Sequence, residues 1–268
     1  MLEIKTIENI GLLSSFKKQY LAQTTAALDG MWLCGFVPMS KHFGFYQDKI
    51  LIGYCCINDD GFLLQFYISQ EYKQFQSEIF SQVVMSKFDI TGKVEGAFVS
   101  TAEPDYASLC LKNFTQSKVN ALMYHKDNDL AQDTKLFMVP AQAEQLMTFV
   151  EFAKNNIGAP EQWVTGYYDN LISRTELFGY WQGDSLIAVG ECRVFDDVQI
   201  GYADLGMVVA ESERGKGMAT PVLNFLINHA QQKGLKPICS TGQTNIAAQK
   251  AISGAGFYSS NHIIQFEV

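Results

Sequence analysis

The sequence has few of the residues that bind metals in proteins, and it does not arrange them as a ligand set. Its four histidines are scattered, and none of its six cysteines forms a C-x-x-C pair. Structural zinc sites need Cys and His ligands clustered at short spacings. We therefore expect no metal site. Because most of the cysteines lie in apolar surroundings, we expect them to be reduced, buried thiols.

The chain also lacks a basic cluster and a long apolar run. Its 28 Asp and Glu outnumber its 20 Lys and Arg, which gives a net charge of −8 and a sequence pI of about 5.0. Surfaces that bind nucleic acid are basic, so nucleic acid is not an expected partner. No stretch reaches the length of a membrane span, and the N-terminus carries no apolar signal core. We expect a cytoplasmic protein with no membrane contact.

Apolar residues are plentiful, at 47% of 268 positions, enough for one large domain or two ordinary ones. The second half shows strand and helix patterns in the order β-α-α-β-β-β-α-β-α-β, and the first half repeats this order more faintly. Matching segments, such as 68–76 and 209–217, lie about 140 residues apart, as an internal duplication would place them. We predict an α+β fold with mixed sheets in two tandem domains, 1–126 and 134–268, joined by a polar linker at 125–133.

The strongest local pattern is a glycine-rich turn between a strand and a helix. An apolar run, 202–209, ends in a polar turn that contains Arg214, Gly215, Lys216 and Gly217. Apolar residues then recur at helical spacing, at Val222, Leu223, Leu226, Ile227 and Ala230. Glycines let the backbone approach a ligand closely, and a helix N-terminus attracts phosphate. The turn is therefore either a site for a pyrophosphate or 3′-phosphate, with added charge from its basic residues, or a plain glycine-rich connection.

Residues 214–219, Arg-Gly-Lys-Gly-Met-Ala, resemble the acetyl-CoA pyrophosphate loop of the GNAT superfamily of N-acetyltransferases. The segment from Asn245 to Phe257 resembles the second cofactor helix of that family, with its closing Gly-Phe. The resemblance covers roughly 134–268 and implies a GNAT fold there. With its glycines kept and one tyrosine absent, the second half looks most like tandem GNAT proteins related to the zwittermicin-resistance acetyltransferases.

The resemblance implies a set of residues that bind acetyl-CoA. They are Met207, Val208, Val209, Arg214, Gly215, Lys216, Gly217, Met218, Ala219, Thr220, Asn245 and Lys250. The backbone at Val208 and Val209 would receive the pantetheine arm in a gap between splayed strands, and the backbone of 214–219 would hold the pyrophosphate. Asn245 would touch the pantetheine arm, and Lys250 would approach the nucleotide.

The resemblance is incomplete at the catalytic residues. Many family members have a tyrosine that protonates the leaving thiolate, and Ile252 stands at that position here. Tyr258, Ser253 or solvent would have to replace it. Glu191 and Asp204, on strands expected to border the groove, are candidate general bases. Our default interpretation of each is a solvated or hydrogen-bonded strand residue.

Aromatic residues on the expected helix 160–172 raise a similar choice. Trp163, Tyr167 and Tyr168 lie where the family often binds its acceptor, but their helical spacing is equally explained by packing in the core. Core packing is our default interpretation. His229, on the helix after the glycine turn, is interpreted as structural.

The first half differs from the second at the glycine turn. Gln74 and Gln76 stand where the second half has glycines, and only Lys73 supplies charge. We predict that the N-terminal domain is degenerate and has lost cofactor binding. It would then either cover or shape the substrate groove or serve as a purely stabilising lobe.

The resemblance implies an acetyl-CoA-dependent N-acetyltransferase in which a primary amine of a small molecule attacks the thioester directly. The alternative is a non-catalytic protein that binds or senses acetyl-CoA, an interpretation favoured by Ile252 and the degenerate first half. A protein acetyltransferase would need a groove wide enough for a peptide. The expected partner is the amine acceptor. The chain is expected to be a monomer or a homodimer.

Overall fold

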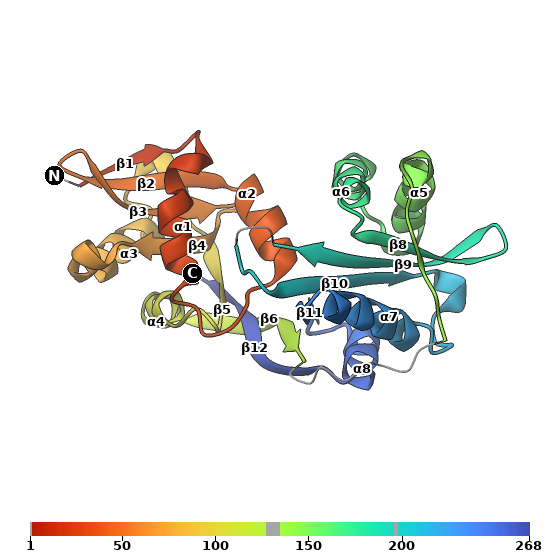
Figure 1. The fold of residues 1–268 in the computed structure, drawn as a ribbon. Helices are drawn as coiled ribbons and strands as arrows, with labels where there is room; N and C mark the ends of the chain where they lie inside the picture. Colours follow the sequence, from red (N-terminus) through yellow and green to blue (C-terminus); the bar gives the residue numbers. More distant parts are fainter. Residues whose placement is uncertain (1, 127–134, 196–197) are drawn as a thin grey trace. The chain divides into compact units, whose positions relative to one another are not determined.

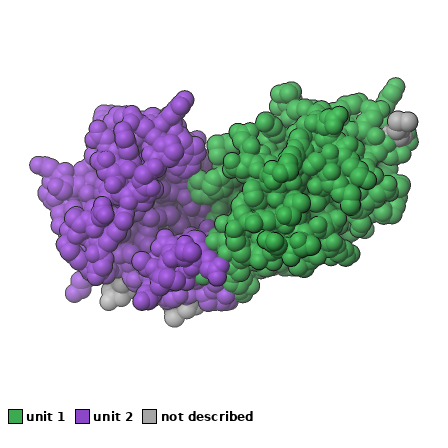
Figure 2. All heavy atoms as spheres, turned by 180° about the vertical axis from the view of Figure 1, so that it is seen from behind, with its two compact units in different colours: residues 1–123, 260–268 green, residues 124–259 purple. Residues whose placement is uncertain are grey.

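The computed structural model of the protein describes residues 2–126, 135–195 and 198–268 (Figure 1). Contacts divide the chain into two compact units, drawn in different colours in Figure 2. Unit 1 comprises residues 1–123 and 260–268, and unit 2 comprises residues 124–259. Most of the predicted linker, from residue 127 onward, lies outside the described residues.

Unit 1 is built on a mixed sheet with the strand order β1-β2-β3-β4-β5-β12-β6. Its elements are β1 (Leu2–Thr6), α1 (Ser14–Leu21), α2 (Val37–Met39), β2 (Lys41–Gln47), β3 (Ile50–Ile57), β4 (Phe62–Ile68), α3 (Gln76–Val84), β5 (Gly96–Ser100), α4 (Pro104–Asn113), β6 (Gln116–His125) and β12 (Tyr258–Glu267). The strands from β1 to β4 pair antiparallel, β4 and β5 pair parallel, and β5 and β12 pair antiparallel. A large apolar cluster with Phe45, Phe66 and Phe80 packs against this sheet, and a second one contains Leu13, Tyr54 and Tyr67.

Unit 2 repeats this plan with the strand order β11-β10-β9-β8-β7. Its elements are β7 (Val139–Pro140), α5 (Leu146–Ile157), α6 (Glu161–Ser173), β8 (Leu177–Gln182), β9 (Ser185–Val194), β10 (Tyr202–Val209), α7 (Ala219–Gln232), β11 (Lys236–Gly242) and α8 (Ile246–Gly254). The strands from β7 to β10 pair antiparallel, and β10 and β11 pair parallel. The mixed sheet with helices predicted from the sequence is confirmed.

The helices of unit 2 pack on both faces of its sheet. Side chains alternate between the two faces along each strand, so each face has its own set of residues for a helix to pack on. Val189 and Val208 pack in one apolar cluster with residues of α5 and α6. The next residue of β9, Gly190, faces the other way, since a Cβ atom there would lie 3.1 Å from Leu226 of α7. Figure 1 shows α5 and α6 on one side of β8–β10 and α7 on the other. The apolar residues that predicted α7 are all buried: Val222, Leu223, Leu226, Ile227 and Ala230.

The same order of elements occurs twice along the chain. The series β2-β3-β4-α3-β5-α4-β6 corresponds to β8-β9-β10-α7-β11-α8-β12. The last residues of the chain, Ile263–Glu267, pair with β5 and so pack with unit 1. The units are defined by contacts, whereas the predicted domains, 1–126 and 134–268, rest on the repeated pattern. Those domain boundaries stay a prediction.

Candidate active site

The parallel pair β10 and β11 separates beyond its first residues. The described pairing covers Tyr202–Asp204 of β10 and Lys236–Ile238 of β11, whereas β10 continues to Val209. After Asp204 the strand β10 remains paired with β9 on its other edge. Backbone N–H and C=O groups on the edge toward β11 are therefore available to a ligand. This is the kind of gap that was predicted beside Val208 and Val209.

Alternation along β10 decides which backbone groups face the gap. In an antiparallel ladder, successive residues direct their N–H and C=O groups alternately toward and away from the partner strand. The Ala210 N–H donates to the Ile187 carbonyl of β9 at 2.9 Å. By alternation, the backbone groups of Val208 also point toward β9, while those of Val209 and Met207 point away from it. Met207 and Val209 thus present hydrogen-bonding groups to the gap.

The turn before α7 depends on two glycines in the left-handed region. Gly215 has a φ of 76° and Gly217 a φ of 79°, values that residues with a Cβ atom rarely adopt. A Cβ atom at either position would meet nothing within 4 Å, so backbone conformation rather than crowding requires glycine here. Helix α7 then begins at Ala219, and the N–H groups of its first turn have no partner within the helix. This end of α7 is suited to an anion.

A groove of about 710 Å³ joins the gap, the glycine turn and the start of α8. That volume falls within the range of small-molecule sites, roughly 300–1,000 Å³. The described lining residues are Asn156, Ile157, Met207, Val208, Val209, Glu213, Arg214, Gly215, Gly217, Met218, Ala219, Thr220, Asn245, Ala247, Ala248, Lys250 and Ala251. Every predicted cofactor residue except Lys216 is among them. The structure therefore brings together residues from three separate stretches of the sequence.

Lys216 lies on the other side of the glycine turn. Together with Lys135 and Tyr180 it lines a neighbouring hollow of about 490 Å³ that shares Gly217 and Met218 with the groove. Its ammonium group forms an ion pair with Glu213 at 3.0 Å. Because the Lys216 side chain is 60% exposed, the pair contributes little to stability and the lysine stays available to a phosphate.

Arg214 has a different environment from the one predicted. Its Nε atom donates to the Val209 carbonyl at 3.3 Å, and its Nη2 atom donates to the Asn156 carbonyl at the end of α5. The sequence pattern assigned this residue to a phosphate, but in the structure its guanidinium binds two carbonyls of the chain. Asn156 was not predicted at all, because its contacts with the loop join residues more than 50 positions apart.

The start of α8 completes the groove. The Asn245 side chain accepts from the Ala248 N–H at 3.2 Å, so it caps α8. Lys250, on the same helix, is exposed at the groove. Ile252 is only 3% exposed, which is the burial expected of an apolar side chain. Ile252 has no group that can donate a proton.

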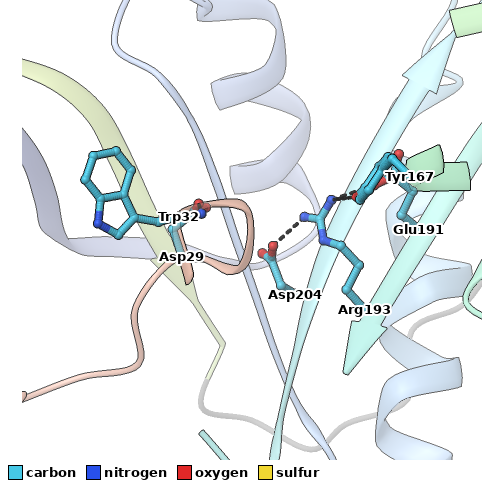
Figure 3. A network of polar contacts seen from close by, with 6 residues as sticks. All are labelled: Asp29, Trp32, Tyr167, Glu191, Arg193 and Asp204. Carbon is cyan, nitrogen blue, oxygen red and sulfur yellow. Dashed lines mark hydrogen bonds and ion pairs between the residues drawn. The ribbon is translucent and has the colours of Figure 1, made fainter. Parts of the chain in front are cut away.

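The two predicted general bases lie close together, joined by an arginine (Figure 3). Glu191 and Arg193 lie on β9 and Asp204 on β10, with exposed fractions of 6% for Glu191 and 1% for Asp204. The Arg193 guanidinium contacts Glu191 at 2.5 Å and also forms an ion pair with Asp204. From α6, the Tyr167 hydroxyl donates to Glu191 at 2.7 Å and accepts from Arg193 at 2.6 Å. We call these four residues the acidic cluster.

The surroundings keep the Arg193 guanidinium charged. Burial lowers the pKa of Arg193, but Asp204, Tyr167 and Glu191 outweigh this effect and raise it well above its usual value. Burial and the Glu191 carboxylate raise the pKa of Tyr167, so its hydroxyl stays protonated. With two carboxylates and one guanidinium, the cluster carries a surplus of one negative charge. Such a surplus attracts an ammonium group.

Gly206 makes room for the acidic cluster. A Cβ atom at Gly206 would lie 2.8 Å from a Glu191 carboxylate oxygen and 3.2 Å from Arg193. The glutamate side chain therefore crosses directly over the backbone of β10. Arg193 was not predicted, although its position two residues after Glu191 on one strand puts both on the same face and was a usable signal. Figure 3 also draws Asp29 of unit 1, whose carboxylate accepts from the Trp32 N–H at 2.7 Å.

The remaining predicted residues lie elsewhere. Tyr258, at the start of β12, is 44% exposed and packs on the His125 ring at 4.0 Å, and it does not line the groove. Its proposed role as a proton donor stays a prediction. Tyr168 is buried in the core, as our default interpretation had it. Trp163, by contrast, is 36% exposed and stacks on Tyr167 with ring centroids 4.9 Å apart.

Unit 1 has no comparable glycine turn. Residues Gln70–Phe75 form a 3₁₀ helix that continues directly into α3, and Gln76 has ordinary right-handed helical angles. Lys73, the one basic residue predicted there, forms an ion pair with Asp105 at 2.7 Å. The described start of α3 thus has no left-handed residue, and Lys73 beside it is already paired with Asp105.

Side chains fill the part of unit 1 that corresponds to the groove. Only about 10 Å³ remains between Tyr20, Gln76, Glu103 and Tyr106, roughly the space of one water molecule. Glu103 accepts from the Tyr20 hydroxyl and, at 2.5 Å, from the Ser100 N–H. The space at this position is far smaller than the groove of unit 2.

Within the described ranges, no group of three or more His, Cys, Asp or Glu residues could hold a metal ion. In the same part of the chain, no helix is both long and apolar enough to cross a membrane. Five of the six cysteines are buried and Cys34 is exposed.

Comparison with known proteins gives a consistent result for both halves. A family model described as an acetyltransferase (GNAT) domain matches residues 9–127, and one described as the acetyltransferase (GNAT) family matches residues 143–257. No curated protein matches the chain.

Several solved structures are similar. An acetyltransferase of the GNAT family from Colwellia psychrerythraea is 54% identical over 99% of both chains, with a TM-score of 0.94. A tandem GNAT protein from the clavulanic acid biosynthesis pathway is 10% identical over 99% of this chain and 98% of its own, with a TM-score of 0.63. A putative acetyltransferase from Pyrococcus horikoshii is 13% identical over 98% of this chain and 88% of its own, with a TM-score of 0.55. The latter two show likeness of fold alone.

Proposed function

Since this chain belongs to the GNAT family of acetyltransferases, we propose that its groove binds acetyl-CoA and that unit 2 transfers the acetyl group to a primary amine of a small molecule. The two GNAT matches and the 54% identical relative support an N-acetyltransferase with its two domains in tandem. One observation carries the cofactor site. The strand gap, the two left-handed glycines and the open end of α7 all meet in a single groove.

The residues of the groove fit acetyl-CoA, which would supply an acetyl group activated as a thioester. The backbone edge at Met207 and Val209 is placed to bind the pantetheine arm, and a donor near Val209 would stabilise the oxyanion that develops. The N–H groups around Gly217 and at the start of α7 would bind the pyrophosphate. Lys216 and Lys250, on either side, would attract the nucleotide phosphates.

The acidic cluster would act on the amine. Its surplus negative charge favours the approach of an ammonium group, and a carboxylate of Glu191 or Asp204 would accept the amine proton. The exposed face of Trp163, stacked on Tyr167, is a second feature that favours a cation. The competing interpretation of the cluster is an ion-pair network that only holds β9 to β10.

The departing sulfur needs a proton that Ile252 cannot give. Tyr258 or solvent remains the proposed donor, and a CoA thiol is a good enough leaving group for solvent to suffice. A closer relation to the zwittermicin-resistance acetyltransferases, a cytoplasmic location and a monomeric or homodimeric state also stay proposals.

Calorimetric titration of acetyl-CoA tests the cofactor site. We expect the wild type to bind and the double variant Gly215→Gln/Gly217→Gln, which copies the first half of the chain, to lose binding. Non-glycine residues in the left-handed region cost about 1 kcal/mol each, and a loop that escapes this cost by changing conformation loses its convergent N–H groups.

Gly234→Gln is the matched control. Gly234 also has a positive φ, 71°, with open space around its Cβ position, but it follows the far end of α7. This variant places one glutamine in the same left-handed region, away from the groove, and is expected to bind acetyl-CoA normally. A wild type without affinity for acetyl-CoA would refute the site. With binding established, a panel of small amines, read by mass spectrometry of the acetylated product, identifies the acceptor.

A further inference from the structure

The loop between β10 and α7 is attached to the last turn of α5. The Glu211 N–H donates to Asn156 Oδ1 at 2.7 Å, and Asn156 Nδ2 donates to the Phe152 carbonyl at 2.8 Å. Both ends of this amide are therefore occupied, which allows it one orientation. Helix α5 ends at the next residue, and Gly158 follows with a φ of 66°. The attachment thus comes from a rigid, capped helix end.

Arg214 adds a second attachment in the same place. It donates through Nε to the Val209 carbonyl and through Nη2 to the Asn156 carbonyl. A guanidinium is planar and rigid, so two bonds to carbonyls on different elements fix the separation between the end of β10 and the end of α5. The last carbonyls of a helix also carry partial negative charge. The Arg214 guanidinium binds one of these carbonyls, that of Asn156, a residue that lines the groove.

Both attachments act on backbone that faces the groove. Val209 contributes to the strand edge in the gap, and Gly215 directly follows Arg214. We propose that Asn156 and Arg214 are positioning residues for the cofactor loop. They hold residues 209–214 so that the N–H groups beyond them face the pyrophosphate of CoA. On this proposal Arg214 acts through carbonyls of the chain rather than as a phosphate ligand.

This proposal rests on the proposed cofactor site, and calorimetry with CoA tests both. Asn156→Ala removes the side-chain bond to Glu211 without changing any charge, and we expect Kd to rise about fivefold. Arg214→Lys keeps the charge but loses the planar fork, and we expect Kd to rise about tenfold. Asn155→Ala, at the exposed neighbouring position of the same helix, is the control and should bind as the wild type does.

Hydrogen–deuterium exchange separates a local effect on the loop from a general loss of stability. Without CoA, amides of residues 210–219 should exchange faster in Asn156→Ala and Arg214→Lys, while those of β9 keep their wild-type protection. Saturating CoA should restore protection to the loop.

The two hypotheses fail in different ways. A wild type that binds no CoA overturns the cofactor site and this proposal with it. A wild type that binds, with unchanged Kd and loop exchange in Asn156→Ala and Arg214→Lys, overturns the positioning role alone. If Arg214→Lys binds normally and only Arg214→Met loses affinity, Arg214 acts by charge and the positioning role is again refuted.

Discussion

Arg193 is the residue that decides what the acidic cluster can do. It bonds to both candidate bases, so neither carboxylate is free of a positive partner. Each carboxylate already accepts from the Arg193 guanidinium, so a proton taken from an amine would compete with that contact. Burying one guanidinium with two carboxylates leaves a net negative charge, which an incoming ammonium group would balance. The cluster is thus better suited to a cationic acceptor than to a neutral one.

Replacing both carboxylates tests the cluster as a catalytic group. We expect Glu191→Gln/Asp204→Asn to lower kcat/KM about 100-fold, the usual contribution of a general base, while the Kd for acetyl-CoA stays near the wild-type value. Steady-state kinetics with an acceptor found in the amine panel gives the rates.

The control for this experiment is Glu176→Gln. Glu176 is also buried, at 4% exposed, and also pairs with an arginine, Arg174 at 2.9 Å, but it lies outside the acidic cluster. Like the double variant, Glu176→Gln should lower stability because it breaks a buried ion pair. It should nevertheless keep full acetylation activity. If the double variant acetylates as fast as the wild type, the cluster only joins β9 to β10.

For single helices and turns, sequence patterns predicted the features that are set by residues close together in the chain. Helix α7 followed from its apolar spacing, and the turn before it followed from Gly215 and Gly217, whose left-handed angles are a local requirement. The bond between Asn156 and Glu211 depends on contact between segments 55 residues apart, which no local pattern encodes. The contact between Arg214 and Asn156 spans 58 residues and was missed for the same reason. Arg193 did have a local signal, its place two residues after Glu191 on the same strand.

The start of α4 shows what replaced the groove in unit 1, and it makes stability depend on pH. Burial raises the pKa of Glu103 to about 7, although bonds from Tyr20 and Ser100 oppose the shift. Since the pKa of Glu103 is higher in the folded state than in the unfolded state, its contribution to the free energy of unfolding is complete below about pH 4.5. It is lost as pH rises to about 7. The neighbouring Tyr54 and Tyr106 have raised pKa values and stay neutral in this range.

We therefore expect Glu103→Gln to remove this pH dependence. The wild type should lose about 3 kcal/mol of unfolding free energy between pH 4.5 and 8 at this site, and the variant should not. The Tyr20 hydroxyl can rotate to accept from the new amide. Urea unfolding at several pH values measures the difference, with the exposed Glu71→Gln as control. Parallel pH curves for wild type and Glu103→Gln would contradict the assignment.

For the whole molecule, the end of the chain limits how the two halves can be studied separately. Ile263–Glu267 of β12 pair with β5, so they belong to unit 1 although the repeat assigns them to the second domain. A fragment that ends near residue 126 would lack this strand and expose the edge of β5. The loss of cofactor binding in the first half must therefore be tested in the full chain.

Binding stoichiometry in the full chain provides that test. Unit 1 has about 10 Å³ where unit 2 has its groove, Lys73 is paired with Asp105, and Gln76 replaces the left-handed glycine. We expect calorimetry to give one acetyl-CoA per wild-type chain and none per chain of Gly215→Gln/Gly217→Gln. Two sites in the wild type, or one site remaining in the glycine variant, would mean that unit 1 still binds the cofactor. In that case its filled cleft must open, and Glu103 and Tyr20 would have to separate to admit the ligand.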